Sequence, residues 1–191
     1  MAFVPKRVLF EAQALEYERG RKIREYMRSL GVPSTVIKGN RVSGIPGSGR
    51  EGFINAKNTL VVGVRKVTKF ATCKPSAHFQ LPLTSSCPGM CEYCYLHTTL
   101  GTKPYPRVYV NVEEVLEEAQ KEIEARLPEV TVFEGAATSD PIPTEPYTGL
   151  LKTVIEYFGM QEQGRFRFVT KFTDVDTLLD ADHRGHTRFR F

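Results

Sequence analysis

The feature that most constrains the fold of this sequence is the regular alternation of strand-like and helical segments in its second half. Strand composition at residues 131–134 and 166–170 brackets a helical pattern at residues 148–158, and residues 187–191 again have strand composition. A spacing of about 30 residues between successive strands is typical of βαβ units, whose strands lie parallel. The sequence therefore predicts an α/β fold built on a parallel sheet, with a short helix at residues 175–179 before the last strand.

The segment that begins at Asn111 gives the clearest helix prediction. Asn111 is a favourable N-cap residue, and Glu114 follows three positions later, as in a capping box. Apolar side chains then recur at helical spacing, and Pro128 ends the pattern. This apolar stripe consists of Val112, Val115, Leu116, Ala119, Ile123 and Leu127. We expect a helix from residue 112 to about residue 127.

The N-terminal part predicts shorter elements. Strands are expected at residues 7–10, 36–37 and 59–65, and a charged helix at residues 14–30. The stretch 39–52 (GNRVSGIPGSGREG) is rich in Gly and Ser and predicts a loop or linker. Its GxGxxG-like pattern is not framed by a strand and a helix, so we reject a dinucleotide site.

Charge is unevenly distributed along the chain. Residues 1–80 hold 15 Lys or Arg against 5 Asp or Glu, whereas residues 81–191 hold 11 against 17. A basic segment can attract the phosphates of a nucleic acid through counterion release. The same charge pattern is equally compatible with a solvated basic face that binds no partner.

The composition argues against a membrane protein. Hydrophobic residues make up 41% of the chain and charged residues 25%, as in ordinary globular proteins. No apolar run approaches the roughly 18 residues that a membrane span needs, and the N-terminus (MAFVPKR) lacks the apolar region of a secretory signal. We expect a cytoplasmic protein with no membrane partner. Because the sequence stops at Phe191, inside an expected strand, we also expect a fragment of a longer chain; a complete but unusually short protein is the alternative.

Three of the four cysteines, Cys87, Cys91 and Cys94, fall within eight residues with the spacing C-x3-C-x2-C. A short strand expected at residues 80–83 leads into this loop. In a cytosolic chain such a group indicates metal binding rather than disulfides. Three thiolates can hold three irons of a 4Fe–4S cluster and leave the fourth iron open to a cofactor. The alternative is structural zinc, with His97 or Cys73 as a further ligand.

Segments around the cysteine motif share the pattern of a known family. They are residues 57–65 (KNTLVVGVR), 74–77 (KPSA), 94–105 (CYLHTTLGTKPY), 133–140 (FEGAATSD), 167–171 (RFVTK) and 187–191 (TRFRF). With C-x3-C-x2-C followed by an aromatic residue, they resemble the spore photoproduct lyases of the radical S-adenosylmethionine (radical SAM) superfamily. The resemblance is looser before residue 57.

This resemblance implies a partial (β/α) TIM-type barrel of the radical SAM kind, with the cluster loop after the first strand. A small N-terminal α/β extension would precede the barrel. We place the division at the Gly-rich stretch, so that residues 1–55 form the extension and linker. Residues 56–191 would then be the N-terminal portion of a barrel that is incomplete in this chain.

The resemblance also implies an enzyme that repairs DNA. Such a lyase reverts spore photoproduct (5-thyminyl-5,6-dihydrothymine) to two thymines through a 5′-deoxyadenosyl radical, with a flipped-out lesion. The implied cofactors are a 4Fe–4S cluster and S-adenosyl-L-methionine. The implied partners are UV-damaged DNA and an electron donor such as flavodoxin or ferredoxin, in a bacterial spore or germinating cell. A radical SAM enzyme with a different substrate remains an alternative, as does the structural zinc module.

Individual roles follow from the resemblance residue by residue. The residues that match the cluster ligands are Cys87, Cys91 and Cys94. Those that match contacts to S-adenosylmethionine are Tyr93, Ser139 and Lys171, and an ammonium or hydroxyl group suits a carboxylate or ribose. Tyr95 matches a tyrosine that relays a radical back toward the cofactor. A turn residue at Ser139, a solvated Lys171 and a packed Tyr95 are the alternatives without the resemblance.

One position departs from the family pattern. Many members carry a hydrogen-donating cysteine in the segment EAACTSD, but this sequence reads EGAATSD and has Ala137 at that place. An alanine cannot usefully donate that hydrogen atom. Cys73 is the one cysteine outside the cluster motif, and we hypothesise that it replaces the missing donor. The alternative is an inert, buried Cys73.

Overall fold

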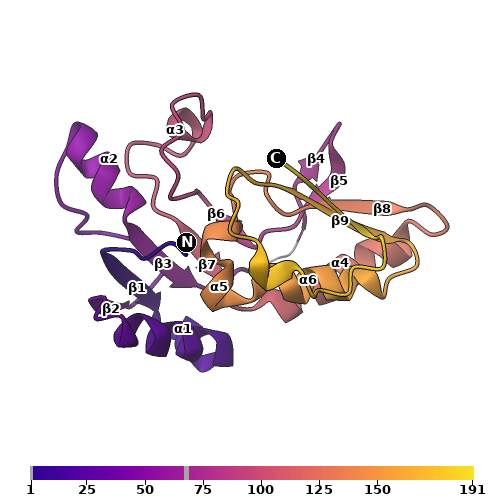
Figure 1. Ribbon diagram of the computed structural model, residues 1–191, viewed down its shortest axis with the longest axis horizontal. Helices are drawn as coiled ribbons and strands as arrows, with labels where there is room; N and C mark the ends of the chain where they lie inside the picture. Colours follow the sequence, from indigo (N-terminus) through magenta and orange to yellow (C-terminus); the bar gives the residue numbers. More distant parts are fainter. Residues whose placement is uncertain (1, 67–68) are drawn as a thin grey trace.

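The structure, a computed structural model that describes residues 2–66 and 69–191, contains two five-stranded sheets flanked by helices (Figure 1). Sheet A has the strand order β2-β1-β3-β7-β6, and sheet B has the order β10-β9-β8-β5-β4. All strand pairs are parallel except β6 with β7 and β4 with β5. The predicted α/β class with parallel sheets is confirmed.

Sheet A carries the N-terminal elements. Its strands are β1 (Arg7–Glu11), β2 (Ser34–Ile37), β3 (Thr59–Gly63), β6 (Thr84–Ser85) and β7 (Arg107–Tyr109). Helices α1 (Glu18–Ser29) and α2 (Gly49–Lys57) lie on opposite sides of this sheet (Figure 1). Every residue of β3 is buried, as a central strand covered on both faces requires. Strands from both sides of residue 55 share this sheet, and the domain division there stays a prediction.

Sheet B contains the barrel strands. They are β4 (Thr72–Cys73), β5 (Ala77–Gln80), β8 (Thr131–Glu134), β9 (Gly164–Val169) and β10 (Thr187–Arg190). Helices α4 (Val112–Ala125) and α6 (Leu150–Gly159) pack beside it. An aromatic core joins these layers, with Phe158 5.4 Å from Phe133 and 5.6 Å from Phe166 between ring centroids. The sheet does not close on itself within the described chain, so the barrel is partial, as predicted.

Short elements complete the chain. The 3-10 helices are η1 (Ala12–Glu16), η2 (Ile142–Thr144) and η3 (Asp176–Leu178), and the one-turn helices are α3 (Leu96–Thr99) and α5 (Glu145–Thr148). In the parts of the chain that are described, no helix is both long and apolar enough to cross a membrane.

The structure corrects several expected boundaries. The stretch 39–52 is not all loop, because α2 begins at Gly49. The expected strand at residues 80–83 is replaced by β5, which ends at Gln80, and β6, which begins at Thr84. The helix expected at residues 14–30 starts only at Glu18, after η1. The expected helix at 148–158 is divided by Gly149, whose left-handed φ of 61° separates α5 from α6.

The capping prediction for α4 is also corrected. Asn111 is the N-cap residue, but its side chain makes no cap bond to the helix backbone. Instead it binds the backbone of Arg65 through Oδ1 (2.9 Å) and Nδ2 (2.8 Å), and Nδ2 also donates to Glu114 (2.8 Å). The expected apolar stripe of α4 is buried through Ile123, whereas Leu127 is 57% exposed beyond the helix end.

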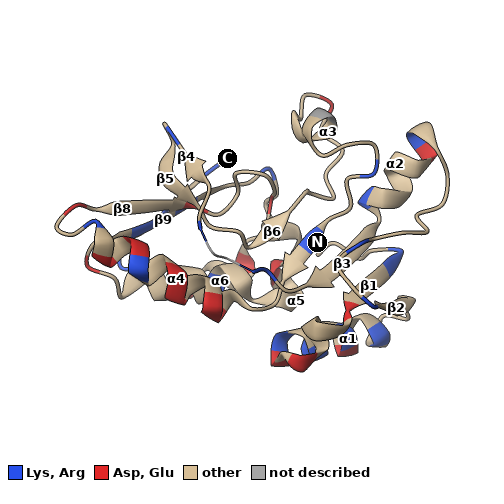
Figure 2. Cartoon of the chain, turned by 180° about the vertical axis from the view of Figure 1, so that it is seen from behind, with Lys and Arg blue, Asp and Glu red and all other residues tan. Residues whose placement is uncertain are grey.

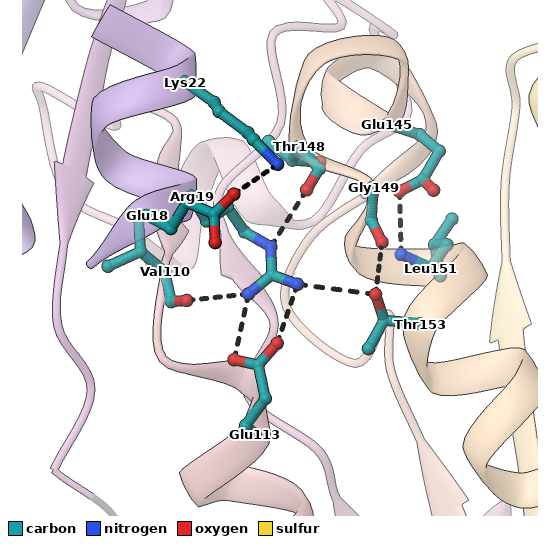
Figure 3. A network of polar contacts seen from close by, with 10 residues as sticks. All are labelled: Glu18, Arg19, Lys22, Val110, Glu113, Glu145, Thr148, Gly149, Leu151 and Thr153. Atoms are coloured by element: carbon teal, nitrogen blue, oxygen red, sulfur yellow. Dashed lines mark hydrogen bonds and ion pairs between the residues drawn. The ribbon is translucent and has the colours of Figure 1, made fainter.

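Arg19 links α1 to α4 and α5 through hydrogen bonds and an ion pair (Figure 3). Its guanidinium donates to the carbonyl of Thr148 at 3.0 Å and to that of Val110 at 2.9 Å. It also pairs with both oxygens of Glu113, at 3.0 and 2.9 Å. Only 17% of the Arg19 side chain is exposed. One residue of α1 thereby satisfies acceptors at the ends of β7 and α5 and in α4.

Arg19→Ala is expected to lower the free energy of unfolding by about 2 kcal/mol, because two partly buried carbonyls and one carboxylate lose a charged donor. Urea denaturation would measure it. The matched control is Lys22→Ala, one turn further along α1, where the ion pair with Glu18 leaves both side chains more than 70% exposed. Such pairs contribute little, so the control should keep its midpoint. Equal midpoints for both variants would contradict the role of Arg19.

Candidate functional site

The three clustered cysteines lie on one loop at the carboxyl end of the first barrel strand. After β5 and β6, residues 87–95 lead into α3 (Figure 1). Cys94 N donates to the Cys91 carbonyl at 3.0 Å and His97 N donates to the Cys94 carbonyl at 3.1 Å, which makes the loop turn tightly. All three thiols are free and partly exposed. Barrel enzymes place their active sites at this end of the strands.

Gly89 keeps the space beside the first two thiols open. Its N–H donates to Cys87 Sγ at 3.2 Å. A Cβ atom at Gly89 would lie 3.3 Å from Cys87 Sγ and 3.8 Å from Cys91 Sγ. A side chain at this position would therefore occupy space that a metal bound to either sulfur needs.

A buried lysine stands beside the three thiols. Lys57, the last residue of α2, is 1% exposed, and its Nζ donates to the Cys87 carbonyl at 2.6 Å. Burial lowers the pKa of Lys57, and the nearby charges of Cys87, Cys94 and Cys91 act in the opposite direction. No carboxylate of the described residues forms an ion pair with it. A buried charge normally has a counter-charge, and the cysteines are the groups beside Lys57 that could supply one, although burial raises the pKa of Cys87 to about 12.

The thiols are not arranged around a single metal ion. Within residues 2–66 and 69–191, no group of three or more His, Cys, Asp or Glu side chains is placed to hold one ion. The His97 ring packs edge-on against Phe53, with 5.1 Å between ring centroids, and its buried Nε2 has no hydrogen-bond partner among the described residues. The structure therefore does not bring His97 together with the cysteines as a zinc-type ligand set.

The two tyrosines of the loop have different surroundings. Tyr93 is 78% exposed, and the charge of Cys91 is the main cause that raises its pKa. Tyr95 reaches across to the loop after β8, where its hydroxyl donates to the Ala137 carbonyl. The phenol is thus held against the segment that contains Ala137.

Ser139 is fixed beside the cysteine loop. Its hydroxyl accepts a hydrogen bond of 2.7 Å from Thr84 Oγ1, and it is 8% exposed. Ser86, directly before Cys87, forms a bridge with Ser139, and Ser86 N donates to the Thr138 carbonyl at 2.9 Å. The accepted bond leaves the Ser139 proton available to a ligand.

Asp140 positions the backbone of Lys171. Its carboxylate accepts from Lys171 N at 2.9 Å, from Thr170 Oγ1 at 2.9 and 3.0 Å, and from Ile142 N at 3.2 Å. Burial raises the pKa of Asp140, and these bonds partly offset the rise. The exposed Lys171 side chain begins from an anchored backbone at the end of β9. The carboxyl ends of β8 and β9 thus lead to Ser139 and Lys171, and the Ser86–Ser139 bridge brings the cysteine loop beside them.

Cys73 lies on β4, beside the amino end of β5, and its electrostatic interactions with Glu134 and Tyr95 place it near the site. It pairs with Ala77 in the antiparallel β4–β5 ladder and is partly buried. Burial raises the pKa of the Cys73 thiol, the negative charge of Glu134 raises it further, and Arg167 lowers it. Burial likewise raises the pKa of Tyr95, and the charges of Cys94, Cys73 and Glu134 contribute. Cys73 is therefore a protonated thiol at neutral pH, within electrostatic range of Tyr95.

Sequence reasoning did not identify three residues that build this site. Lys57 opens the family-like segment 57–65, Asp140 closes the segment 133–140, and Thr84 precedes the cysteine motif. For Lys57 the sequence did hold a signal: the lysine directly precedes an apolar strand segment, where a side chain is expected to be buried. Nothing in the sequence indicated that Thr84 would bind Ser139, 55 residues away.

Comparison with known proteins identifies relatives over nearly the whole chain. The family model for spore photoproduct lyase matches residues 3–191. Curated spore photoproduct lyases of Clostridium acetobutylicum and Bacillus subtilis are 50% and 48% identical over 187 and 191 residues. These alignments cover 97% and 99% of the chain but 56% of each relative. The chain thus spans about half the length of the curated relatives it matches.

Solved structures of spore photoproduct lyase share the fold. A double mutant with bound AdoMet (S-adenosylmethionine) and dinucleoside spore photoproduct matches with a TM-score of 0.96 at 51% identity. A complex with dinucleoside spore photoproduct matches with a TM-score of 0.96 at 50% identity. Each match covers 100% of this chain and 57% of the other. The fold expected from the resemblance is confirmed, and the chain belongs to the spore photoproduct lyase family.

Proposed function

We propose that this chain carries the cofactor-binding half of a DNA-repair lyase that reverts spore photoproduct to two thymines. The observation that carries the proposal is the grouping of three free thiols around the buried ammonium of Lys57, at the strand ends that also hold Ser139 and Lys171. The family membership and the substrate bound in solved relatives support it. Because the chain spans about half of those relatives, the complete activity is proposed for the whole protein.

Three free thiols on one loop, with the spacing C-x3-C-x2-C, suit a 4Fe–4S cluster. A cubane cluster takes one thiolate per iron, so three thiolates leave the fourth iron open. Cys87, Cys91 and Cys94 would hold three irons. When bound, the cluster and S-adenosyl-L-methionine supply the 5′-deoxyadenosyl radical that removes a hydrogen atom from the lesion.

The cofactor would be held by groups that the fold already fixes. Ser139 retains a free proton to donate, because its oxygen accepts from Thr84. Lys171 offers an ammonium from a backbone anchored on Asp140, and exposed Tyr93 stands between two cluster ligands. Hydroxyl and ammonium donors suit the carboxylate and ribose of S-adenosylmethionine. AdoMet bound in a solved relative supports this assignment.

Cys73 would complete the reaction as the hydrogen donor. Homolysis of its S–H bond transfers one hydrogen atom to the thymine radical that remains after the inter-thymine bond breaks, which leaves a thiyl radical. Tyr95 would then restore the thiol by giving up its O–H hydrogen and pass the radical back toward the cofactor. The raised pKa of Cys73 keeps the thiol form that this transfer needs. The solved double mutant that carries AdoMet likewise has one cysteine replaced by alanine and one serine replaced by cysteine.

Two further partners follow from this function. UV-damaged DNA would supply the thymine dimer, and an electron donor such as flavodoxin or ferredoxin would supply the single electron for each reductive cleavage of S-adenosylmethionine. The bacterial spore or germinating cell, in its cytoplasm, is the proposed setting.

Anaerobic reconstitution tests the proposal. We expect about four irons and four acid-labile sulfides per chain, and an EPR signal of the reduced cluster that changes when S-adenosylmethionine is added. Cys94→Ala should lose the cluster, whereas Cys73→Ala, outside the motif, should retain it. Stoichiometric zinc in oxygen-free material would instead identify the structural zinc module.

Activity is then measured on the protein extended to the length of its relatives. Cleavage of S-adenosylmethionine with no conversion of dinucleoside spore photoproduct would indicate a radical SAM enzyme with another substrate, the alternative that Ala137 raises.

A further inference from the structure

A cavity of about 540 Å³ lies at the carboxyl ends of the parallel strands of sheet A. Glu11 ends β1, Lys38 follows β2, Arg65 and Lys66 follow β3, and Tyr109 ends β7. From β1 the chain passes to β2 on one side of β1, and from β2 it crosses to β3 on the other side of β1. The strand order therefore changes direction at β1. Open α/β sheets bind ligands at such a switch point. The cavity is separate from the cysteine loop, none of whose residues lines it.

A buried ion pair between Glu11 and Arg107 lines this cavity. Glu11 and Arg107 are 7% and 9% exposed and form a salt bridge to each other. Glu11 also accepts from Val64 N at 3.1 Å, and Arg107 donates to the Asn40 carbonyl at 3.0 Å. A Cβ atom at Gly63 would lie 2.6 Å from the Glu11 carboxylate, so this glycine makes room for the pair. Among the described lining residues, Glu11 supplies the single carboxylate, and Arg107 neutralises it.

Three further cations line the cavity without a counter-charge. Lys38, Arg65 and Lys66 are exposed, and none of them forms an ion pair with any described residue. The Arg65 guanidinium lies over the Tyr109 ring, 5.6 Å from its centroid. The three cations come from the segments that follow β2 and β3, whereas α4 carries mainly acidic positions (Figure 2). The cavity therefore offers about three net positive charges and an aromatic face to a ligand.

Arg65 and Tyr109 also line a second, smaller cavity of about 90 Å³. That cavity is bounded by Ala137 and Ser139, the residues assigned above to the donor position and the cofactor contact. The two cavities thus share two wall residues. A ligand that extends from the second cavity past Arg65 would enter the first.

We propose that the cavity at the switch point of sheet A binds a backbone phosphate of the DNA strand next to the lesion, an inference that rests on the proposed function. Guanidinium and ammonium groups bind phosphate oxygens strongly, and phosphate contacts fix the register of a protein on DNA without reading sequence. A strand rather than a free nucleotide is the occupant, because the shared wall connects this cavity to the one beside Ala137. Lys38 and Lys66 supply the ammonium contacts, and Arg65 lies between the two cavities.

The test compares two pairs of cations in the reconstituted protein, extended to the length of its relatives. Lys38→Gln with Lys66→Gln removes two charges from the cavity, and Arg24→Gln with Arg28→Gln removes two exposed charges from α1. Fluorescence anisotropy measures affinity for a duplex oligonucleotide that contains spore photoproduct, as a function of salt. The cavity variant should bind about tenfold more weakly, and its log–log salt slope should be smaller by about two, while the α1 variant keeps the wild-type slope.

A second arm uses ligands without flanking phosphates. Dinucleoside spore photoproduct should bind wild type and cavity variant equally, because it has no neighbouring phosphate. Two results would overturn the inference: an equal loss of oligonucleotide affinity in the cavity variant and the α1 variant, or a salt slope of the cavity variant equal to that of the wild type. Saturable ATP binding that the cavity variant loses, without a change in oligonucleotide affinity, would overturn it in favour of a free nucleotide. If damaged DNA were not preferred over undamaged DNA, the proposed function would fail instead.

Discussion

Cys73→Ala is expected to separate consumption of spore photoproduct from formation of thymine. The variant retains the three cluster cysteines, so cleavage of S-adenosylmethionine and attack on the lesion should still begin. The thymine radical then lacks its S–H donor, because Ala137 cannot give up a hydrogen atom. We expect the share of consumed lesion that is recovered as thymine to fall at least about tenfold.

Product analysis of the extended, reconstituted protein would measure this effect. Chromatography of the digested substrate gives the thymine recovered for each lesion lost, and S-adenosylmethionine cleavage is counted in the same reaction. Cys73→Ser is the matched control for size, since its O–H bond is a far poorer hydrogen donor than S–H. It should behave like the alanine variant.

A rescue variant distinguishes a donor from a packing residue. Cys73→Ala combined with Ala137→Cys places a thiol in the segment to which the Tyr95 hydroxyl is bonded. Thymine recovery should return toward that of the wild type. Full recovery of thymine in Cys73→Ala alone, with no second thiol, would rule out Cys73 as the donor.

The cysteine loop and the barrel strands were predictable because their signals are local. C-x3-C-x2-C spacing places three thiols on one loop in any fold, and strands such as 131–134 are short apolar runs bounded by turn residues. The burial of Val115, Leu116 and Ala119 likewise followed from helical spacing alone. Where one short segment carries the information, the sequence analysis and the structure agree.

Helix α2 was missed because tertiary packing outweighs its propensity. Gly52 lowers helix stability by about 1 kcal/mol, and Gly49 begins the helix with a left-handed φ of 51°, so the stretch 39–52 has the composition of a linker. The structure buries Gly52, Ala56 and Lys57 of this helix. Glycine-rich composition therefore indicated a loop where close packing requires small residues.

Long-range pairs were beyond the reach of sequence patterns. Glu11 and Arg107 are separated by 96 residues; Glu11 is the last residue of β1 and Arg107 is the first residue of β7. Their pairing depends on β1 and β7 both flanking β3. The same holds for Asn111, which looked like a helix cap but binds the backbone of Arg65, 46 residues away. The sheet order that brings these groups together is a property of the whole fold.

Lys57→Met is expected to make the reconstituted cluster harder to reduce. Reduction adds one negative charge beside the Lys57 ammonium, which is 1% exposed and bonded to the Cys87 carbonyl at 2.6 Å. A buried positive charge favours that added electron, because screening by water is weak there. Loss of the charge should shift the one-electron equilibrium at least about tenfold toward the oxidised cluster, which corresponds to about 59 mV.

A redox titration followed by EPR would measure this shift, and Lys57→Arg is the matched control because it keeps the charge. Methionine fills the volume of the lysine stem and needs no counter-charge, so the variant should remain folded, which thermal unfolding of the apo protein would check. Lys121→Met, at an exposed position of α4, removes the same charge far from the sulfurs and should leave the potential unchanged. A potential for Lys57→Met equal to that of the wild type, with the cluster intact, would show that the buried ammonium serves packing alone.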